Sequence, residues 1–350
     1  MSPVLPAPRS PRELLTAFAD YDHAQGFDNF LDQFDFTGVT PHQVYYSVLG
    51  RLPESAQVAR MPAAYDARQH MHSVLISKEF QRNLIGVVLH AFPEKQRVFF
   101  VHVPKCAGTD LASHLLQRYP DVCLEQKLMR PAYTPAPQAL LQLQRMMSTL
   151  PQRGEIVLMG HFALDGLLSK GLIRFGDVAF SVVRDPISMA LSVVNYALTL
   201  MELKPQDRPL VALGFINAIN LRMDSHGPPA GPEARKRLGL QLLRDPKVLP
   251  ANNLCNFLGR GDAASAFELC AAANIELTTV SRYEAWLQQR WGVGNSNRAN
   301  ESRRYLSLAD LTADDLAYLH ERSREDQLFY ERIDTLLTAG GRLSLFGAQL

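Results

Sequence analysis

Residues Arg97 to Asp110 read RVFFVHVPKCAGTD, and this stretch decides the fold that we expect. Its first part, Arg97 to Val103, is a compact β-rich run that is typical of a strand buried on both faces. A turn of small residues follows, and an amphipathic helix is predicted from Leu111 to about Arg118. Such a strand, turn and helix N-terminus form a general anion cradle, because free backbone N–H groups and the positive end of the helix dipole point at the ligand.

Two further β-rich runs follow along the chain, Glu155 to Met159 and Asp177 to Val183, each separated from the next by helix-compatible sequence. This alternation predicts crossover helices and a parallel sheet covered on both faces. We therefore expect an α/β fold, a three-layer P-loop-like domain with a central parallel sheet, over residues 95–350.

The residues ahead of this domain have a different pattern. Residues 1–10 are predicted to be a flexible leader, and residues 11–94 a helical module, because apolar positions recur there at spacings of three and four. Val44 to Pro53 and Ser77 to Phe80 resemble a short bacterial helical module of unassigned function, often found in proteins that build cell-surface carbohydrate. A helical extension that packs on the main domain is the alternative interpretation.

Composition limits the class of protein. The chain has 350 residues, 47% of them hydrophobic and 20% charged, with a formal net charge of +1, which argues against disorder and against a nucleic-acid partner. Four cysteines lack the spacing of a zinc site or a disulfide scaffold, so we expect reduced thiols and no metal. No signal peptide and no membrane span is predicted. We expect a cytoplasmic protein, and homo-oligomerisation stays open.

The turn after the first strand differs from the P-loop of nucleotide triphosphatases. Lys105 precedes the turn, whereas the lysine of that P-loop follows its last glycine, so an ATP-dependent kinase is disfavoured. Ala107 and Gly108 allow the backbone to approach a ligand closely, and the Thr109 hydroxyl is placed to bond a phosphate oxygen.

A second motif follows the third strand, at Arg184 to Ser192. Arg184 at the strand end and Ser192 about two turns into the next helix can converge on one phosphate, and Pro186 suits the first helical turn. The Arg-Asp-Pro sequence recurs at Arg244 to Pro246, but there it follows a helical stretch and has no serine at the matching offset. We interpret that second copy as structural.

A histidine follows the second strand, in the sequence Gly160-His161-Phe162. Because the carboxyl ends of parallel strands meet at one edge of a sheet, His161 is expected at the same edge as the two phosphate-binding motifs. An imidazole exchanges protons near neutral pH, which suits a general base. A buried structural histidine is the alternative.

These three motifs together carry a resemblance to a known family. Phe100 to Thr109 resembles the 5′-phosphosulfate loop of carbohydrate sulfotransferases, in particular the heparan sulfate 2-O-sulfotransferase type. Arg184 and Ser192 resemble that family's 3′-phosphate site, and His161 resembles its catalytic base. The resemblance extends from about Arg97 to Tyr330, dense at the two phosphate motifs and thin between them.

The resemblance implies transfer of a sulfuryl group from 3′-phosphoadenosine 5′-phosphosulfate (PAPS) to a hydroxyl of a carbohydrate, with Lys105 stabilising the leaving phosphate and His161 acting as base. It implies that the nucleotide is bound by the turn, by the 3′-phosphate pair and by a polar loop near the C-terminus, namely Lys105, Cys106, Ala107, Gly108, Thr109, Asp110, Arg184, Ser192, Arg303 and Arg304. A solvated basic loop is the alternative for the last two.

Two positions depart from the family's pattern. Asp110 stands where the family prefers Ser or Thr, and we expect its carboxylate to point away from a phosphosulfate or to cap the helix. Met189 stands at a position that is commonly basic. Cys106 is expected to pack rather than to act as a nucleophile.

Two alternatives to a carbohydrate sulfotransferase stay open. The first keeps the chemistry and takes a tyrosine-containing peptide as acceptor instead of a glycan. The second, from another class, is a non-catalytic nucleotide-binding scaffold that has kept the fold. Asp110 and Met189 favour this alternative, and it is disfavoured by Lys105, Arg184, Ser192 and His161.

Overall fold

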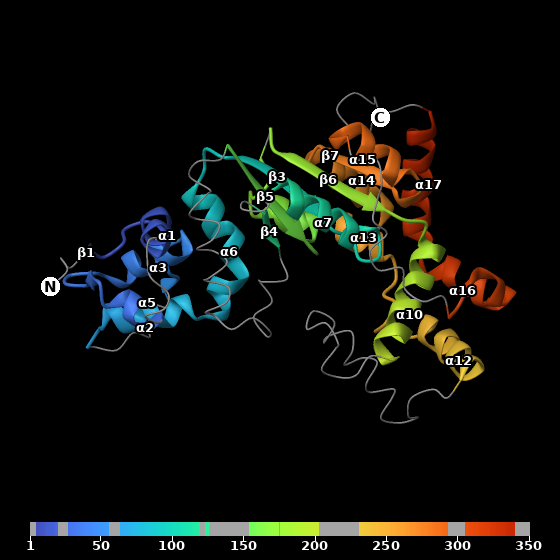
Figure 1. Ribbon diagram of the computed structural model, residues 1–350, viewed down its shortest axis with the longest axis horizontal. Helices are drawn as coiled ribbons and strands as arrows, with labels where there is room; N and C mark the ends of the chain where they lie inside the picture. The colour runs from blue at the N-terminus through green and yellow to red at the C-terminus, as the bar shows by residue number, and fades with distance from the viewer. Residues whose placement is uncertain are drawn as a thin grey trace. The chain divides into compact units, whose positions relative to one another are not determined.

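The structure is a computed structural model that describes residues 5–19, 27–55, 64–119, 123–125, 154–174, 176–202, 231–292 and 305–339 (Figure 1). The chain divides into two compact units, Met1–Val98 with Leu116–Met159 and Phe99–Leu115 with Gly160–Leu350. The domain boundary that we predict at 94/95 lies close to the first crossing between these units. The first unit also takes in residues 116–159.

A parallel sheet is the centre of the fold, which confirms the predicted α/β class. Five strands lie in the order β4-β5-β3-β6-β7, so that the strand preceding Lys105 is the middle one. Both β4 with β5 and β6 with β7 pair in parallel. The strands are β3 (Gln96–Val101), β4 (Cys123–Glu125), β5 (Glu155–Gly160), β6 (Val178–Val183) and β7 (Ile275–Thr279). The three predicted strands are confirmed with small changes at their ends, whereas β4 and β7 were not predicted.

The strands next to the middle of the sheet are apolar because both of their faces are covered. In β3, β5 and β6 every residue except the first is buried. Phe100 stacks on Phe180 of β6 with ring centroids 5.6 Å apart. The one polar residue in β6, Ser181, donates its hydroxyl hydrogen to the Val101 carbonyl at 2.6 Å, so no buried polar group is left unpaired there.

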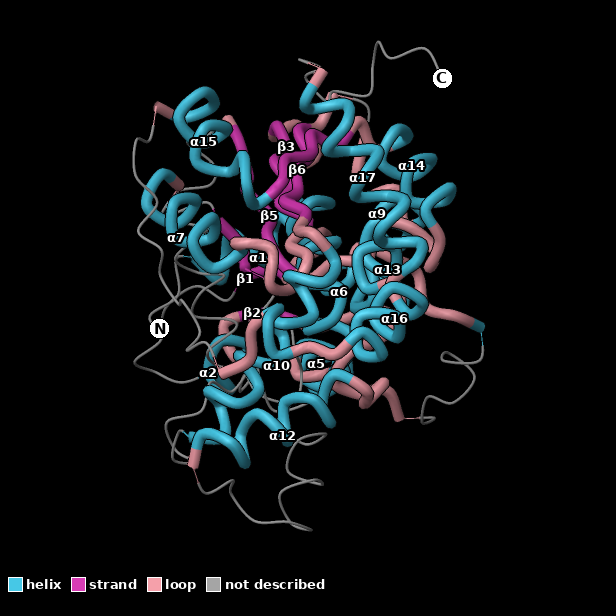
Figure 2. The backbone as a smooth tube through the Cα atoms, turned by 90° about the vertical axis from the view of Figure 1, so that its right-hand side faces the viewer, coloured by secondary structure: helices cyan, strands magenta, loops and turns pink. Residues whose placement is uncertain are grey.

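Helices of the second unit lie on both sides of β6 (Figure 2). On one side are α7 (Gly108–Arg118) and α15 (Tyr283–Trp291), and the Trp286 ring of α15 packs 5.7 Å from Phe180. On the other side are α9 (Leu164–Ser169), α13 (Asn253–Leu258), α14 (Ala263–Ala272) and α17 (Arg324–Thr338). This arrangement fits a three-layer α/β domain.

A second helical cluster completes this unit. It comprises α10 (Pro186–Glu202), α12 (Pro232–Leu243) and α16 (Ala313–Arg322), which share a core that includes Val194, Leu242 and Leu319. Two short 3-10 turns, η6 (Val280–Arg282) and η7 (Leu308–Asp310), precede α15 and α16. The long helix α10 begins at the end of β6, as its motif predicts, with Pro186 in the first turn.

The first unit carries the helices predicted for residues 11–94. They are α1 (Pro11–Ala19), α2 (Phe27–Leu31), α3 (Pro41–Leu49), α5 (Ala67–Leu75) and α6 (Lys78–Ala91), and two short parallel strands, β1 (Leu5–Pro6) and β2 (Phe34–Asp35), accompany them. Among the described residues, no helix of either unit is long and apolar enough to cross a membrane.

Residues that resemble the bacterial helical module have structural roles in this unit. Gly50 ends α3 in a left-handed conformation with φ of 68°, which glycine adopts without strain. The next residue, Arg51, donates to the Glu79 carboxylate at the start of α6. Ser77 caps α6 by accepting the Phe80 N–H at 3.1 Å. The motif therefore joins the end of one helix to the start of another.

Candidate functional site

The turn after β3 has an unusual backbone. Lys105 and Ala107 both lie in the left-handed region, with φ of 65° and 56°, although neither is glycine. Such residues cost about 1–3 kcal/mol each and gather at functional sites. Neighbouring residues of opposite φ sign turn successive N–H groups toward one point and so form a concave anion-binding surface. Such a backbone suits the anion cradle that the sequence predicts.

Helix α7 begins at Gly108, three residues earlier than the predicted start at Leu111. The first N–H groups of a helix have no intrahelical partner, so the earlier start places them directly after the turn. Thr109 is exposed at this helix N-terminus, where its hydroxyl is available to a ligand.

Gly108 is required by packing. A Cβ atom at this position would lie 1.6 Å from Nε2 of His102, the residue that follows β3. His102 and Gly108 therefore hold the helix N-terminus close against the strand end. No sequence motif predicted this contact.

We expect Gly108→Ala to destabilise the second unit by about 1–3 kcal/mol, because a side chain must be forced into a filled site. Denaturant unfolding measures the loss. The double variant Gly108→Ala/His102→Ala should recover part of it, since the imidazole that clashes is gone. Gly166→Ala in α9, where a Cβ meets nothing within 4 Å, is the control and should not destabilise. Equal effects of the two alanines would contradict the packing argument.

The two phosphate motifs meet in space. Nη1 of Arg184, at the end of β6, donates a hydrogen bond to the Lys105 carbonyl at 3.2 Å. This bond joins the turn after β3 to the motif after the neighbouring strand. The predicted convergence of the two motifs at one edge of the sheet therefore holds for Lys105 and Arg184.

Lys105 and Arg184 form a local concentration of positive charge. Burial, and then the positive charge of Arg184, lower the pKa of Lys105 to about 8. Within the described part of the chain neither side chain pairs with a carboxylate. Two half-buried cations without a negative partner favour binding of an anion at this place.

The second Arg-Asp-Pro copy provides a contrast. Arg244 lies just after α12, where its guanidinium donates to the Asp315 carboxylate at 2.8 Å and lies over the Tyr318 ring at 5.1 Å. Its charge is therefore already paired, which agrees with the structural interpretation of this copy.

One face of α10 covers the turn. Met189 of this helix is buried with its Sδ atom 3.9 Å from the Cys106 Sγ. Ser192 and Tyr196 follow at spacings of three and four residues, which keeps them on the same face. The Tyr196 ring lies under Lys105, with Nζ 3.9 Å from the ring centroid. The half-buried Ser192 thus lies on the face of α10 that is directed toward the turn.

Cys106 and Asp110 have the roles that the sequence suggests for them. Burial raises the pKa of the Cys106 thiol to about 12, so the thiol stays protonated and packs against α10 instead of acting as a nucleophile. Asp110 is 7% exposed, and its Oδ2 lies 3.5 Å from Nε2 of His114, one turn further along α7. The pKa of Tyr283 is raised first by burial of its hydroxyl and second by the negative charge of Asp110. The carboxylate is thus directed along the helix and away from the turn.

His161 lies directly after β5 and contacts the residue that precedes the turn. Its Nδ1 is 2.8 Å from the His102 carbonyl oxygen, and the two imidazoles stack with centroids 4.2 Å apart. A carbonyl oxygen can only accept, so Nδ1 carries the proton, and in the neutral ring Nε2 carries the lone pair. The half-buried His161 therefore has the tautomer that a base acting through Nε2 needs.

A buried carboxylate stabilises the N-terminus of α13, the helix that packs next to His161. Asp326 of α17 is fully buried and accepts the N–H groups of Leu254 and Cys255 at 3.0 and 2.9 Å, which caps α13. Burial raises the pKa of Asp326, and the N–H bonds oppose this shift. Phe257 of α13 lies with its ring 6.2 Å from that of His161. Sequence reasoning missed this role, which depends on a contact between distant segments.

Two of the predicted nucleotide contacts come from the polar loop near the C-terminus. Arg303 and Arg304 are outside the described residues. Asp165 forms an exposed ion pair with Arg260 at 2.9 Å. Among the residues that the structure describes, no three His, Cys, Asp or Glu side chains gather as metal ligands would.

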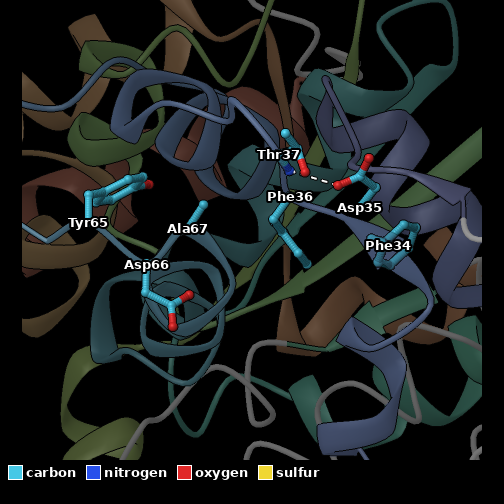
Figure 3. A pocket seen from close by; sticks show the side chains of 7 residues that line it. All are labelled: Phe34, Asp35, Phe36, Thr37, Tyr65, Asp66 and Ala67. Atoms are coloured by element: carbon cyan, nitrogen blue, oxygen red, sulfur yellow. Dashed lines mark hydrogen bonds between the residues drawn. The ribbon is translucent and has the colours of Figure 1, made fainter.

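A groove of about 720 Å³ lies in the first unit, lined by Phe34–Thr37 and Tyr65–Ala67 (Figure 3). Asp35 accepts the Thr37 N–H at 2.8 Å, and Asp66 caps α5. Its charged side chains are acidic, and none of the predicted site residues lines it. This groove therefore does not suit a nucleotide that carries several phosphates.

Comparisons of the chain with protein-family models, with curated proteins and with solved structures found no match.

Proposed function

We propose that this chain is a PAPS-dependent sulfotransferase with a P-loop-like α/β domain. The single observation that supports this most is the bond from Arg184 to the Lys105 carbonyl. It brings to one strongly turned loop two half-buried cations that have no carboxylate partner among the described residues. A donor with a phosphosulfate at one end and a separate 3′-phosphate needs two cationic positions of this kind.

Different residues of the site bind different groups of the PAPS donor. The N–H groups of Lys105 and Ala107 in the turn, and of Gly108 to Asp110 at the start of α7, bind the 5′-phosphosulfate, since a helix N-terminus favours anions. Arg184 binds the 3′-phosphate with its fork of N–H donors, and Ser192 adds a hydroxyl. Lys105 adds a compact charge that can move with the reacting group.

PAPS supplies an activated sulfuryl group, which passes to the acceptor oxygen as the bond between sulfur and the 5′-phosphate oxygen breaks. Lys105 stabilises the negative charge that develops on the departing phosphate oxygen. Nε2 of His161 takes the proton of the acceptor hydroxyl, while the His102 carbonyl holds Nδ1–H and so fixes the tautomer. Both side chains come from strand ends, which keeps them in place.

The acceptor that we propose is a hydroxyl of a carbohydrate, in a glycan or glycolipid. This choice rests on the resemblance of His161 and its neighbours to the 2-O-sulfotransferase type, and on the resemblance of the N-terminal helices to a module often found in proteins that build cell-surface carbohydrate. A tyrosine-containing peptide would use the same donor site. Incubation with radiolabelled PAPS and a panel of glycans and tyrosine peptides distinguishes the two, and failure to label any acceptor despite donor binding would favour the non-catalytic scaffold.

Binding of the product nucleotide tests the donor site directly. Adenosine 3′,5′-bisphosphate should raise the melting temperature because it binds only the folded protein; a concentration 100 times the Kd contributes about 2.7 kcal/mol. AMP lacks the 3′-phosphate and should raise it much less. Arg184→Ala should remove most of the difference between the two nucleotides.

The chain offers a matched control in its second Arg-Asp-Pro copy. Arg244→Ala loses the ion pair with Asp315 and should lower the melting temperature of the free protein. The difference between bisphosphate and AMP should nevertheless be retained in this variant. Equal stabilisation of the wild type by AMP and by the bisphosphate would remove Arg184 and Ser192 from the proposed site.

A further inference from the structure

An aromatic ring lies directly beneath the ammonium group of Lys105. Nζ is 3.9 Å from the centroid of the Tyr196 ring, well within the distance of about 6 Å at which the ring face attracts a cation. Burial raises the pKa of Tyr196, so its hydroxyl stays neutral and the ring adds no charge of its own. Nothing in the sequence motifs pointed to this residue.

Apart from the Tyr196 ring, the described groups that act on Lys105 carry no negative charge. Arg184, from the end of β6, is positive and disfavours a second cation nearby. Cys106, the next residue in the turn, has a protonated thiol because burial raises its pKa to about 12. Burial of Lys105 itself also favours the neutral amine. The Tyr196 ring, from α10, opposes these effects.

The position of the ring is built into the fold. The Met189–Cys106 contact packs the first turns of α10 against the same loop, and Ser192 lies between Met189 and Tyr196 on that face. The helix that offers a hydroxyl to the 3′-phosphate therefore also places an aromatic surface under the lysine of the phosphosulfate loop.

We propose that Tyr196 is a positioning residue for Lys105, whose ring face keeps the lysine charged and directs its ammonium group within the phosphosulfate site. This inference rests on the proposed function only in the use that it assigns to Lys105. It predicts that the pKa of Lys105 depends on the ring face of Tyr196 and does not depend on the tyrosine hydroxyl.

The test measures the titration midpoint of the Lys105 ammonium group directly. Protein with 13C at the lysine Cε atoms is titrated by NMR, and the Lys105 signal is assigned by its absence in Lys105→Arg. We expect Tyr196→Leu to lower the Lys105 titration midpoint by about 0.4–1.5 pH units, the range that a cation–π contact supports. Tyr196→Phe, which keeps the ring face, should titrate like the wild type. Tyr196→Met is a second variant without a ring in case the leucine variant does not fold.

A matched control removes a similar tyrosine elsewhere. Tyr318 of α16 lies under Arg244, and Tyr318→Leu should leave the Lys105 titration unchanged. An unchanged midpoint in folded Tyr196→Leu or Tyr196→Met would overturn the inference. A shift in Tyr196→Phe as large as in Tyr196→Leu would also overturn it, because the hydroxyl would then be the important group.

Bisphosphate affinity separates this inference from the proposed function. If the midpoint falls by one unit from about 8, the charged fraction of Lys105 at pH 7.5 falls about three-fold, and Tyr196→Leu should weaken binding more at pH 7.5 than at pH 6. Wild-type protein that does not bind the bisphosphate, but whose Lys105 midpoint shifts in Tyr196→Leu, would refute the proposed function and leave the role of Tyr196 intact.

Discussion

Lys105→Ala is expected to lower turnover by about 10²–10³-fold, the usual loss when one group that stabilises a departing oxygen is removed. Bisphosphate affinity should fall much less, because the N–H groups of the turn, the start of α7 and Arg184 remain. Steady-state transfer of radiolabelled sulfate and bisphosphate binding, measured on one preparation, give the two numbers. Turnover near the wild-type value would show that another group stabilises the leaving phosphate, and Arg303 and Arg304 would be tested next.

The pH dependence provides an independent check on Lys105. A lysine must be protonated to stabilise the leaving oxygen, so kcat/KM should fall as the pH rises through about 8, where the free enzyme's Lys105 loses its proton. Lys105→Arg should lack this alkaline limb, since a guanidinium stays charged, although its different shape should lower the rate. An alkaline limb that persists in Lys105→Arg would assign the titration to another group.

The strands at the middle of the sheet could be predicted because each is an uninterrupted apolar run followed by a turn. β3, β5 and β6 have this pattern, and their parallel arrangement follows from the helix-compatible sequence between them. β7 was not predicted because it is only five residues long and its apolar pattern is interrupted by Glu276. That carboxylate is paired with Trp286 and Arg290 of α15, and such long-range partners leave no local pattern.

The donor site could be predicted in outline because strand ends meet at one edge of a parallel sheet. From this rule we predict that Lys105 and Arg184 lie close together, and the structure shows a hydrogen bond between them. The rule says nothing about side-chain directions. The Tyr196 ring beneath Lys105 follows from packing of α10 against the turn, which only the structure reveals. For Asp110 the sequence predicts only a carboxylate that points away from the ligand or caps the helix, and its approach to His114 is seen only in the structure.

Histidines were harder to interpret than lysines and arginines, because an imidazole suits a core as well as an active site. The stacking of His102 on His161 gives both rings a structural role, and the bond from Nδ1 of His161 to the His102 carbonyl also fixes a reactive tautomer. The same contacts are thus compatible with support of the fold and with catalysis, and only a variant that keeps one role and loses the other can separate them.

His161→Asn is expected to be such a variant. An asparagine amide can donate to the His102 carbonyl as Nδ1–H does, but it cannot take a proton from an acceptor hydroxyl. His161→Asn and His161→Ala should both lose about 10²–10⁴-fold in turnover, the contribution of a positioned base, while bisphosphate affinity is kept. The wild-type rate should rise with pH as the imidazole loses its proton, and this limb should vanish in both variants. His320→Ala, an exposed position in α16, is the control and should keep the limb.

A purely structural role for His161 would give a different set of results, because the free energy of unfolding would then depend on the hydrogen bond and the rate would not. His161→Ala would melt earlier, His161→Asn would recover much of the stability, and turnover per folded molecule would stay close to the wild type in both. Melting temperature, bisphosphate affinity and turnover on one preparation of each variant therefore decide the matter. Normal stability together with normal turnover in His161→Ala would exclude both roles, and Asp165, held by Arg260, would be the next candidate for the base.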